Sequence, residues 1–138
     1  MALHEHSVVE IANGRSGSAT YKDDVMLISE VAVEVGLEPK TIRFYERARL
    51  IEPKKHGRIR IFRSRDVARL HGIKKLRQYG ISLSTMRSII AREGDLTLAT
   101  VNSPEVQKLL VLHLVEMNRQ SEFIQEQIAD LKTRLEMA

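Results

Sequence analysis

Apolar residues from position 30 onward recur at helical spacing and are interrupted by a glycine turn. Residues 30–35 follow Ser29, a favourable N-cap, and stop at Gly36. Pro39 then suits the first position of a second helix that ends near Arg47. Two short helices joined by a tight, glycine-containing turn predict a helix-turn-helix motif.

A small β-hairpin, or wing, is expected next. Residues 58–62 alternate long basic and apolar side chains, which is the periodicity of a strand, and a basic stretch ending in Gly57 precedes them. We expect the tip of the hairpin to carry basic and polar residues: Lys54, Lys55, His56 and Arg58. Its inner face should be Ile59, Ile61 and Phe62.

Two further amphipathic helices are predicted after the wing. The first, capped by Ser64, runs from about 65 to 79 and carries its apolar stripe on Val67, Leu70, Ile73 and Leu76. Gly80 ends it, and Ser82 caps the second, whose inward residues are Leu83, Met86, Ile89 and Ile90. Residues 1–25 lack sustained periodicity, and we expect a flexible tail there.

A long C-terminal helix is predicted after a connector at 93–104. Ser103 and Pro104 supply an N-cap and a first helical position, and no Gly or Pro follows between 105 and 137. Such a helix of about 33 residues would be roughly 50 Å long. It carries a heptad seam, which predicts a dimerisation helix. The seam consists of Gln107, Leu110, Leu114, Met117, Ser121, Ile124, Ile128, Leu131 and Leu135. A helix lying on the surface of a globular domain is the alternative.

Charge is unevenly distributed along the chain. Residues 26–92 carry 16 Lys and Arg against 6 Asp and Glu, a net of +10, whereas residues 93–138 carry 4 against 8, a net of −4. A basic block beside an acidic one is typical of a nucleic-acid-binding domain joined to another element, although a solvated basic face is the alternative.

Composition narrows the function further. The chain has no cysteine, which excludes disulfides, thiolate metal sites and thiol redox sensing. No apolar run reaches the roughly 20 residues of a membrane span, and no signal peptide is recognisable. We expect a soluble, cytoplasmic protein without membrane contact. We find no catalytic constellation, phosphate loop or paired carboxylates, so we do not expect an enzyme.

Several of these motifs resemble those of the MerR family of bacterial transcription regulators. The helix-turn-helix carries the resemblance in Leu27–Ala32, Gly36-Leu37 and above all the string Lys40–Glu46. The turn at Leu50–Pro53, the wing pattern Gly57-x-x-Arg60-x-Phe62 and the segment Gln78–Leu83 continue it. Asp66 lies one residue nearer to the wing than the family pattern places it, and Ile59 stands where the family usually has tyrosine.

The resemblance implies a mainly α fold and a regulator of transcription. It implies a winged helix-turn-helix domain at 26–92 and a dimerisation helix at 105–138 that forms an antiparallel coiled coil in a homodimer. It also implies binding to double-stranded promoter DNA, distortion of the spacer between promoter elements, and RNA polymerase as a further partner. In an antiparallel pair, Ser121 would lie near the dyad, where a small polar residue could set the register.

Eight residues are candidates for DNA contact. Lys40, Thr41 and Arg43 lie at the start of the second helix, the end that faces base edges in this motif. Arg43 suits guanine O6 and N7, with a phosphate or an intramolecular carboxylate as the alternative, and Thr41 suits a thymine methyl group or a phosphate. Tyr45 is either a phosphate contact or a half-buried ring, and Phe44 is expected to be a core residue or a helix-packing residue. In the wing, the phosphate contacts are expected at Lys54, Lys55, Arg58 and Arg60.

The sequence offers no candidate effector site. His113 has no obvious neighbouring ligand and His56 is a lone histidine, so we predict neither a metal nor another cofactor. The chain reaches its last residue where the predicted coiled coil ends, and we expect no drug-binding domain after it. Two other functions remain open: an architectural or excisionase-like DNA-binding protein, and a protein-interaction adaptor that uses the long helix.

Overall fold

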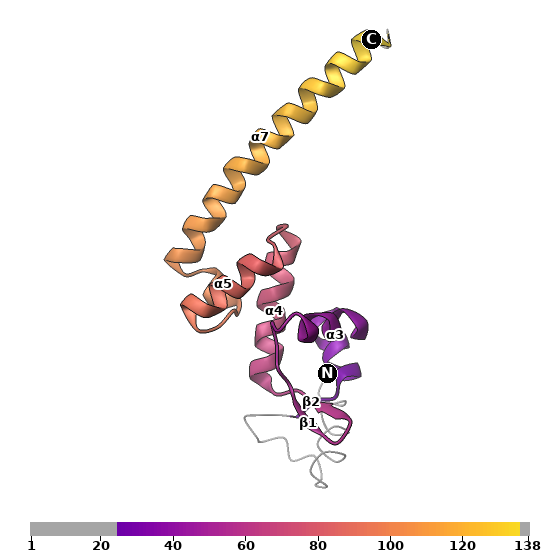
Figure 1. Ribbon diagram of the computed structural model, residues 1–138, viewed down its shortest axis with the longest axis vertical. Helices are drawn as coiled ribbons and strands as arrows, with labels where there is room; N and C mark the ends of the chain where they lie inside the picture. Colours follow the sequence, from indigo (N-terminus) through magenta and orange to yellow (C-terminus); the bar gives the residue numbers. More distant parts are fainter. Residues whose placement is uncertain (1–24, 136–138) are drawn as a thin grey trace. The chain divides into compact units, whose positions relative to one another are not determined.

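The computed structural model describes residues 25–135, which form two units: one extends through Val101 and the other begins at Asn102. The first contains helices α2 to α6 and a two-stranded hairpin, and the second contains the helix α7 (Figure 1). The mainly helical architecture with a small wing is therefore confirmed. All but one residue of the predicted tail at 1–25 lies outside the described residues.

Helices α2 (Ile28–Val35) and α3 (Pro39–Arg47) form the helix-turn-helix. Gly36 ends α2 with a φ of 76°, a left-handed conformation that glycine adopts at little cost, and Pro39 opens α3 as predicted. The start of α2 differs from the prediction, because Leu27 rather than Ser29 is the N-cap. The carboxylate of Glu30 accepts a hydrogen bond from the Leu27 N–H at 3.2 Å and thereby sets the boundary.

Helices α4 (Ser64–Gln78) and α5 (Leu83–Glu93) repeat this kind of arrangement. Ser82 caps α5 as predicted, since its Oγ accepts a hydrogen bond from the Thr85 N–H at 3.1 Å. Ser64 is instead the first helical residue of α4, and Arg63 is the N-cap. The Asp66 carboxylate accepts a hydrogen bond from the Arg63 N–H at 2.9 Å. As in α2, an acidic side chain three residues after the N-cap therefore sets the start of the helix.

Strands β1 (Lys54–His56) and β2 (Ile59–Ile61) pair antiparallel and form the wing. Lys54–His56 therefore forms the first strand instead of the tip, and the turn is Gly57-Arg58. Phe62, at the base of the wing, exchanges two backbone hydrogen bonds of 2.9 Å with Met26. Ile61 and Phe62 are buried, but Ile59 is 51% exposed, because the outer end of the hairpin extends beyond the core. Its prediction as an inner-face residue was wrong.

The core of the first unit is mainly aliphatic, with Ile42, Leu50, Leu70, Ile73 and Ile89 fully buried. All the helices of the unit and the strand β2 contribute to it, including the segment predicted as a plain connector. That segment contains the short helix α6 (Leu98–Val101), and Leu96 just before it is fully buried. Burial of apolar area therefore fixes the connector to the rest of the unit.

Gly72 explains how the connector reaches α4. A Cβ atom at this position would lie 2.4 Å from the Leu96 carbonyl oxygen and 2.9 Å from the Thr97 Cα. The absence of a side chain thus lets the backbone of the connector lie directly against the helix.

Helix α7 (Pro104–Arg134) comprises 31 residues and makes up nearly all of the second unit that is described. Ser103 caps it through a 3.3 Å hydrogen bond from the Val106 N–H to the Ser103 Oγ. Helix, cap and first-position proline agree with the prediction, and the helix stops three residues earlier than expected. Within residues 25–135, no helix combines the length and the apolar character that crossing a membrane requires.

We predict that Gly72→Ala destabilises the first unit by about 1–3 kcal/mol, even though alanine favours a helix, because the new methyl group meets backbone atoms that cannot turn away. Gly57→Ala is the control: nothing lies within 4 Å of its Cβ position, so only the left-handed φ of 63° opposes it. Urea unfolding of both variants measures the difference. A Gly72→Ala protein as stable as the wild type would contradict the close approach.

Candidate DNA interface

One face of α3 is exposed and strongly basic. Successive residues of a helix turn by about 100°, so the burial of Ile42 and Tyr45 directs the opposite face outward. That face carries Lys40, Arg43, Phe44 and Arg47, all of them exposed. Three cations and one phenyl ring therefore share the surface that a helix-turn-helix protein presents to DNA. We call these four residues the basic face of α3.

The structure separates the candidates predicted on this helix. Lys40 and Arg43 lie on the basic face, whereas Thr41 is half-buried at its edge. Tyr45 is only 6% exposed, so its ring belongs to the core and only its hydroxyl could meet DNA. Phe44 was expected to be a core or a helix-packing residue; it is 44% exposed, so its placement in the core was wrong.

The sequence did not predict Arg47 as a candidate DNA contact, nor the exposure of Phe44. A helical wheel places residues 40, 43, 44 and 47 on one side, opposite 42 and 45, once the buried side is known. In a helix of nine residues the apolar positions are too few to show from the sequence which aromatic residue faces inward.

Glu46 links α3 to the wing. Its carboxylate pairs with the Arg60 guanidinium and lies 3.9 Å from the Lys55 Nζ, and these two residues face each other across the hairpin. Arg60 and Lys55 were predicted as phosphate contacts, yet both serve an internal ion-pair group. Lys54 and Arg58 are exposed, and among the described residues no ion pair is seen for either.

Side chains from α4 and α5 bind the end of α3. The Arg87 guanidinium donates to the Ala48 carbonyl at 3.0 Å, and Arg69 donates to the Leu50 carbonyl at 2.8 Å. Between them, Arg49 holds a φ of 64°, which is costly for a residue with a side chain. Positively charged side chains at the C-terminal end of a helix stabilise it. Here they also hold the backbone around Arg49, with its unfavourable φ, in place.

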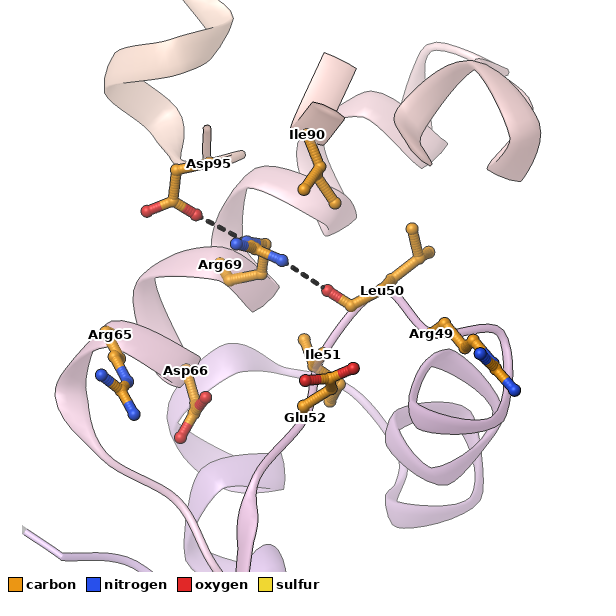
Figure 2. Close-up of a pocket in the computed structure, with 9 residues that line it drawn as sticks. All are labelled: Arg49, Leu50, Ile51, Glu52, Arg65, Asp66, Arg69, Ile90 and Asp95. Carbon is orange, nitrogen blue, oxygen red and sulfur yellow. Dashed lines mark hydrogen bonds and ion pairs between the residues drawn. The ribbon is translucent and has the colours of Figure 1, made fainter. Parts of the chain in front are cut away.

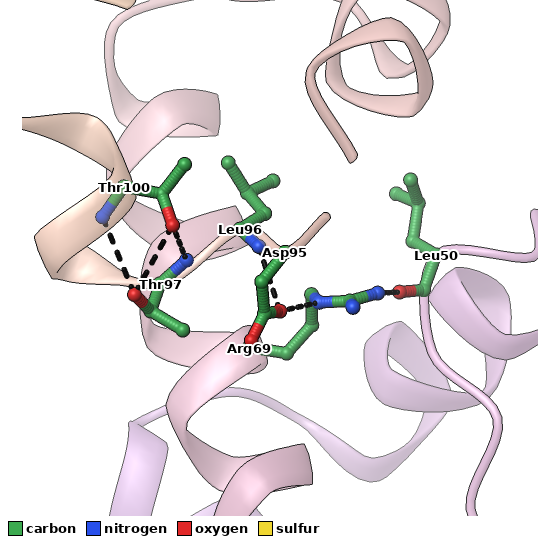
Figure 3. A network of polar contacts seen from close by, with 6 residues as sticks. All are labelled: Leu50, Arg69, Asp95, Leu96, Thr97 and Thr100. Atoms are coloured by element: carbon green, nitrogen blue, oxygen red, sulfur yellow. Dashed lines mark hydrogen bonds and ion pairs between the residues drawn. The ribbon is translucent and has the colours of Figure 1, made fainter. Parts of the chain in front are cut away.

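Arg69 extends this contact to the connector. Its Nε donates to the Asp95 carboxylate at 2.6 Å, and the same oxygen of Asp95 accepts the Leu96 N–H at 2.7 Å (Figure 3). On the other side of α4, Lys74 donates to the Val35 carbonyl at 2.8 Å and so caps α2. Helix α4 is therefore tied by charged side chains to both helices of the motif.

Arg69 crosses a surface pocket of about 440 Å³. Figure 2 shows its walls, in which guanidinium and carboxylate groups alternate. They are formed by Arg49, Leu50, Ile51, Glu52, Arg65, Asp66, Arg69, Ile90 and Asp95. Three positive and three negative side chains leave the pocket without a dominant sign of charge. No group of three or more potential metal ligands occurs among residues 25–135.

The seam of α7 is largely exposed. Leu114, Met117, Ile124, Ile128, Leu131 and Leu135 are each more than 40% exposed, Ser121 is exposed, and Leu110 is half-buried. Additional exposed apolar residues lie beside the seam: Val111, Leu112, Val115 and Phe123. A contiguous apolar stripe of this length is typical of a surface that another helix covers.

Comparison with known proteins decides the family. The model of the MerR HTH family regulatory proteins matches residues 26–93. A Haemophilus influenzae protein named "Probable heavy metal-dependent transcriptional regulator" is 33% identical over 109 residues, which cover 78% of this chain and 83% of that protein. The chain belongs to the MerR family. It is thus a DNA-binding transcription regulator and not an enzyme.

Solved structures of MerR-family regulators share this fold. One from Listeria monocytogenes is 25% identical, with a TM-score of 0.51 over 80% of this chain and 83% of that one. Another, from Bacillus cereus, is 21% identical, with a TM-score of 0.59 over 82% and 84%. The winged helix-turn-helix expected from the resemblance is confirmed.

Two arginines of the wing should respond differently to replacement. Arg58→Ala should lower the salt slope of DNA binding by about 1 for each site occupied, because a phosphate contact releases a counterion, and it should leave stability unchanged. Arg60→Ala should instead lower the free energy of unfolding by about 1 kcal/mol, because the half-buried Glu46 loses its main partner. Titrations at several salt concentrations and urea unfolding give both quantities. Equal salt slopes for Arg58→Ala and the wild type would remove Arg58 from the interface.

Proposed function

We propose that this MerR-family regulator binds promoter DNA as a homodimer and distorts the spacer between the two promoter elements. The observation that carries the proposal is that one chain has both a basic face on α3 and an exposed heptad seam on α7. The first suits the major groove, and the second suits a copy of itself. RNA polymerase, in the cytoplasm, is the further partner that this function requires.

The DNA contacts divide into two kinds. On α3 we assign base contacts to Lys40 and Arg43, with Arg43 bidentate to guanine, and phosphate contact to Arg47. Lys54 and Arg58 of the wing hold phosphates, which fix the register of the protein on the duplex. Lys55 and Arg60 contribute mainly by holding the wing to Glu46. Thr41 and the hydroxyl of Tyr45 remain candidates for contacts at the rim of the interface.

An antiparallel arrangement of α7 is supported by the place of Ser121 in the seam. The seam from Gln107 to Leu135 is centred on Ser121, whose small side chain would allow close approach at the dyad.

Metal dependence is not carried over from the Haemophilus influenzae relative. Thiolate ligands bind soft metal ions, and this chain contains no cysteine, so a thiolate site of that kind is not available to it.

Replacement of a seam residue should dissociate the dimer. Ile124→Gln places an amide in the apolar seam and should lower both association and DNA affinity, since each half-site would then bind alone. Thr133→Gln, an exposed substitution outside the seam with the same new side chain, should change neither. Sedimentation equilibrium measures the association. A dimer that survives Ile124→Gln unweakened would contradict a seam-mediated interface.

Transcription in vitro tests the action on the promoter. A genomic footprint of the protein first supplies the site. The spacer of that promoter is then lengthened or shortened one base pair at a time, and transcription by purified RNA polymerase is measured with and without the protein. Distortion of the spacer predicts that the regulatory effect changes sign or vanishes as the spacer length changes. The same effect at every spacer length would contradict distortion and favour an architectural protein or simple occlusion.

A further inference from the structure

Phe44 is an apolar side chain on the basic face of α3. It is 44% exposed, and its ring centroid lies 5.8 Å from that of the buried Tyr45, with the planes inclined by 52°. One side of the phenyl ring thus packs against the helix-turn-helix core and the rest is open to solvent. Lys40, Arg43 and Arg47 are exposed on the same face of α3, with Lys40 about one turn before Phe44 and Arg47 about one turn after it.

A single exposed hydrophobic residue is common on protein surfaces and needs no function. Phe44 differs from such residues in its position, because Lys40 and Arg47, about one turn before and one turn after it, bring its ring near the duplex whenever the basic face enters a major groove. A phenyl ring has no hydrogen-bonding group, so it can bind neither a phosphate oxygen nor the polar edge of a base. The apolar group that the major groove offers is the C5 methyl group of thymine.

We propose that Phe44 is a specificity-determining residue that contacts the C5 methyl group of thymine in the DNA site. This inference rests on the proposed entry of α3 into the major groove and adds a requirement for thymine at defined positions. Thr41, which the sequence suggested for this role, is half-buried, whereas Phe44 is the apolar side chain on the exposed face. Since 5-methylcytosine carries its methyl group at the same ring position, it should be accepted in place of that thymine with respect to this contact.

Replacement of thymine by deoxyuridine isolates the methyl group, since it leaves base pairing and the polar groove edge unchanged. The full-length protein is first used to select binding duplexes from a randomised pool. Each thymine of the selected duplex is then replaced by deoxyuridine, and affinity is measured by fluorescence anisotropy. At the thymines that Phe44 contacts, the affinity of the wild type should fall about fourfold for each methyl group removed. This is the effect expected when one buried group of the size of a methylene is lost.

Phe44→Ala should bind thymine and deoxyuridine duplexes equally at those positions, and Phe44→Leu should keep part of the preference. Val33→Ala is the matched control, because Val33 is an 80% exposed apolar residue on α2, outside the basic face, and its removal should leave the preference intact. Circular dichroism of each variant establishes that it is folded.

Three outcomes would overturn the proposal. They are a wild type indifferent to deoxyuridine at every thymine, a Phe44→Ala protein as sensitive to the replacement as the wild type, and a Val33→Ala protein that loses the preference equally. A pool from which no sequence is enriched would contradict the proposed specific binding itself. An enriched sequence without a methyl effect would overturn the role of Phe44 alone.

Discussion

The proposed DNA-binding surface depends on a helix that is too short to be stable by itself. Helix α3 has nine residues, whereas isolated helices shorter than about 12–15 residues are marginal in water. Its stability must come from tertiary contacts: Ile42 and Tyr45 are buried in the core, and Arg87 and Arg69 bind carbonyl groups at its exit. These contacts fix the rotation of the helix about its axis, and that rotation decides which side chains face outward.

The basic residues of the first unit consequently have two kinds of role. Lys74 and Arg87 donate hydrogen bonds to carbonyl groups at the ends of α2 and α3, Arg69 donates to the Leu50 carbonyl just after α3, and Arg60 pairs with Glu46. Lys40, Arg43, Arg47, Lys54 and Arg58 are exposed and carry the proposed DNA contacts. The net charge of the block therefore overstates the number of phosphates that one subunit can neutralise. The acidic Glu46 connects the two groups, because it holds the wing beside α3.

Much of the fold could be predicted from the sequence because its signals are local. Gly36, Pro39, Ser82 and Ser103 mark helix boundaries through their own backbone or side-chain chemistry, and the family motif confirms their order. Ser29 and Ser64 misled the prediction, since a carboxylate at Glu30 or Asp66 competes for the same cap. The helix in the connector was missed because it depends on Gly72, 24 or more residues earlier, which leaves space for Leu96.

The site was harder to predict than the fold for a related reason. Residue type identified Lys40, Arg43 and Arg58 correctly as exposed cations, but it could not distinguish them from Arg60, whose partner lies 14 residues away on another element. Adjacent Phe44 and Tyr45 look interchangeable in sequence, and only the packing of α3 shows that the phenol is buried while the phenyl ring is exposed.

Dimethyl sulfate protection of guanine N7 tests most directly whether the two α3 helices of a dimer occupy the major groove. The measurement uses a duplex selected by the full-length protein. The account predicts two clusters of protected guanines whose centres are separated by one helical turn, about 10–10.5 base pairs, or a multiple of it, and loss of both clusters in Arg43→Ala. A single cluster, or a complex in which guanine N7 remains fully reactive, would contradict a dimer that reads DNA with α3.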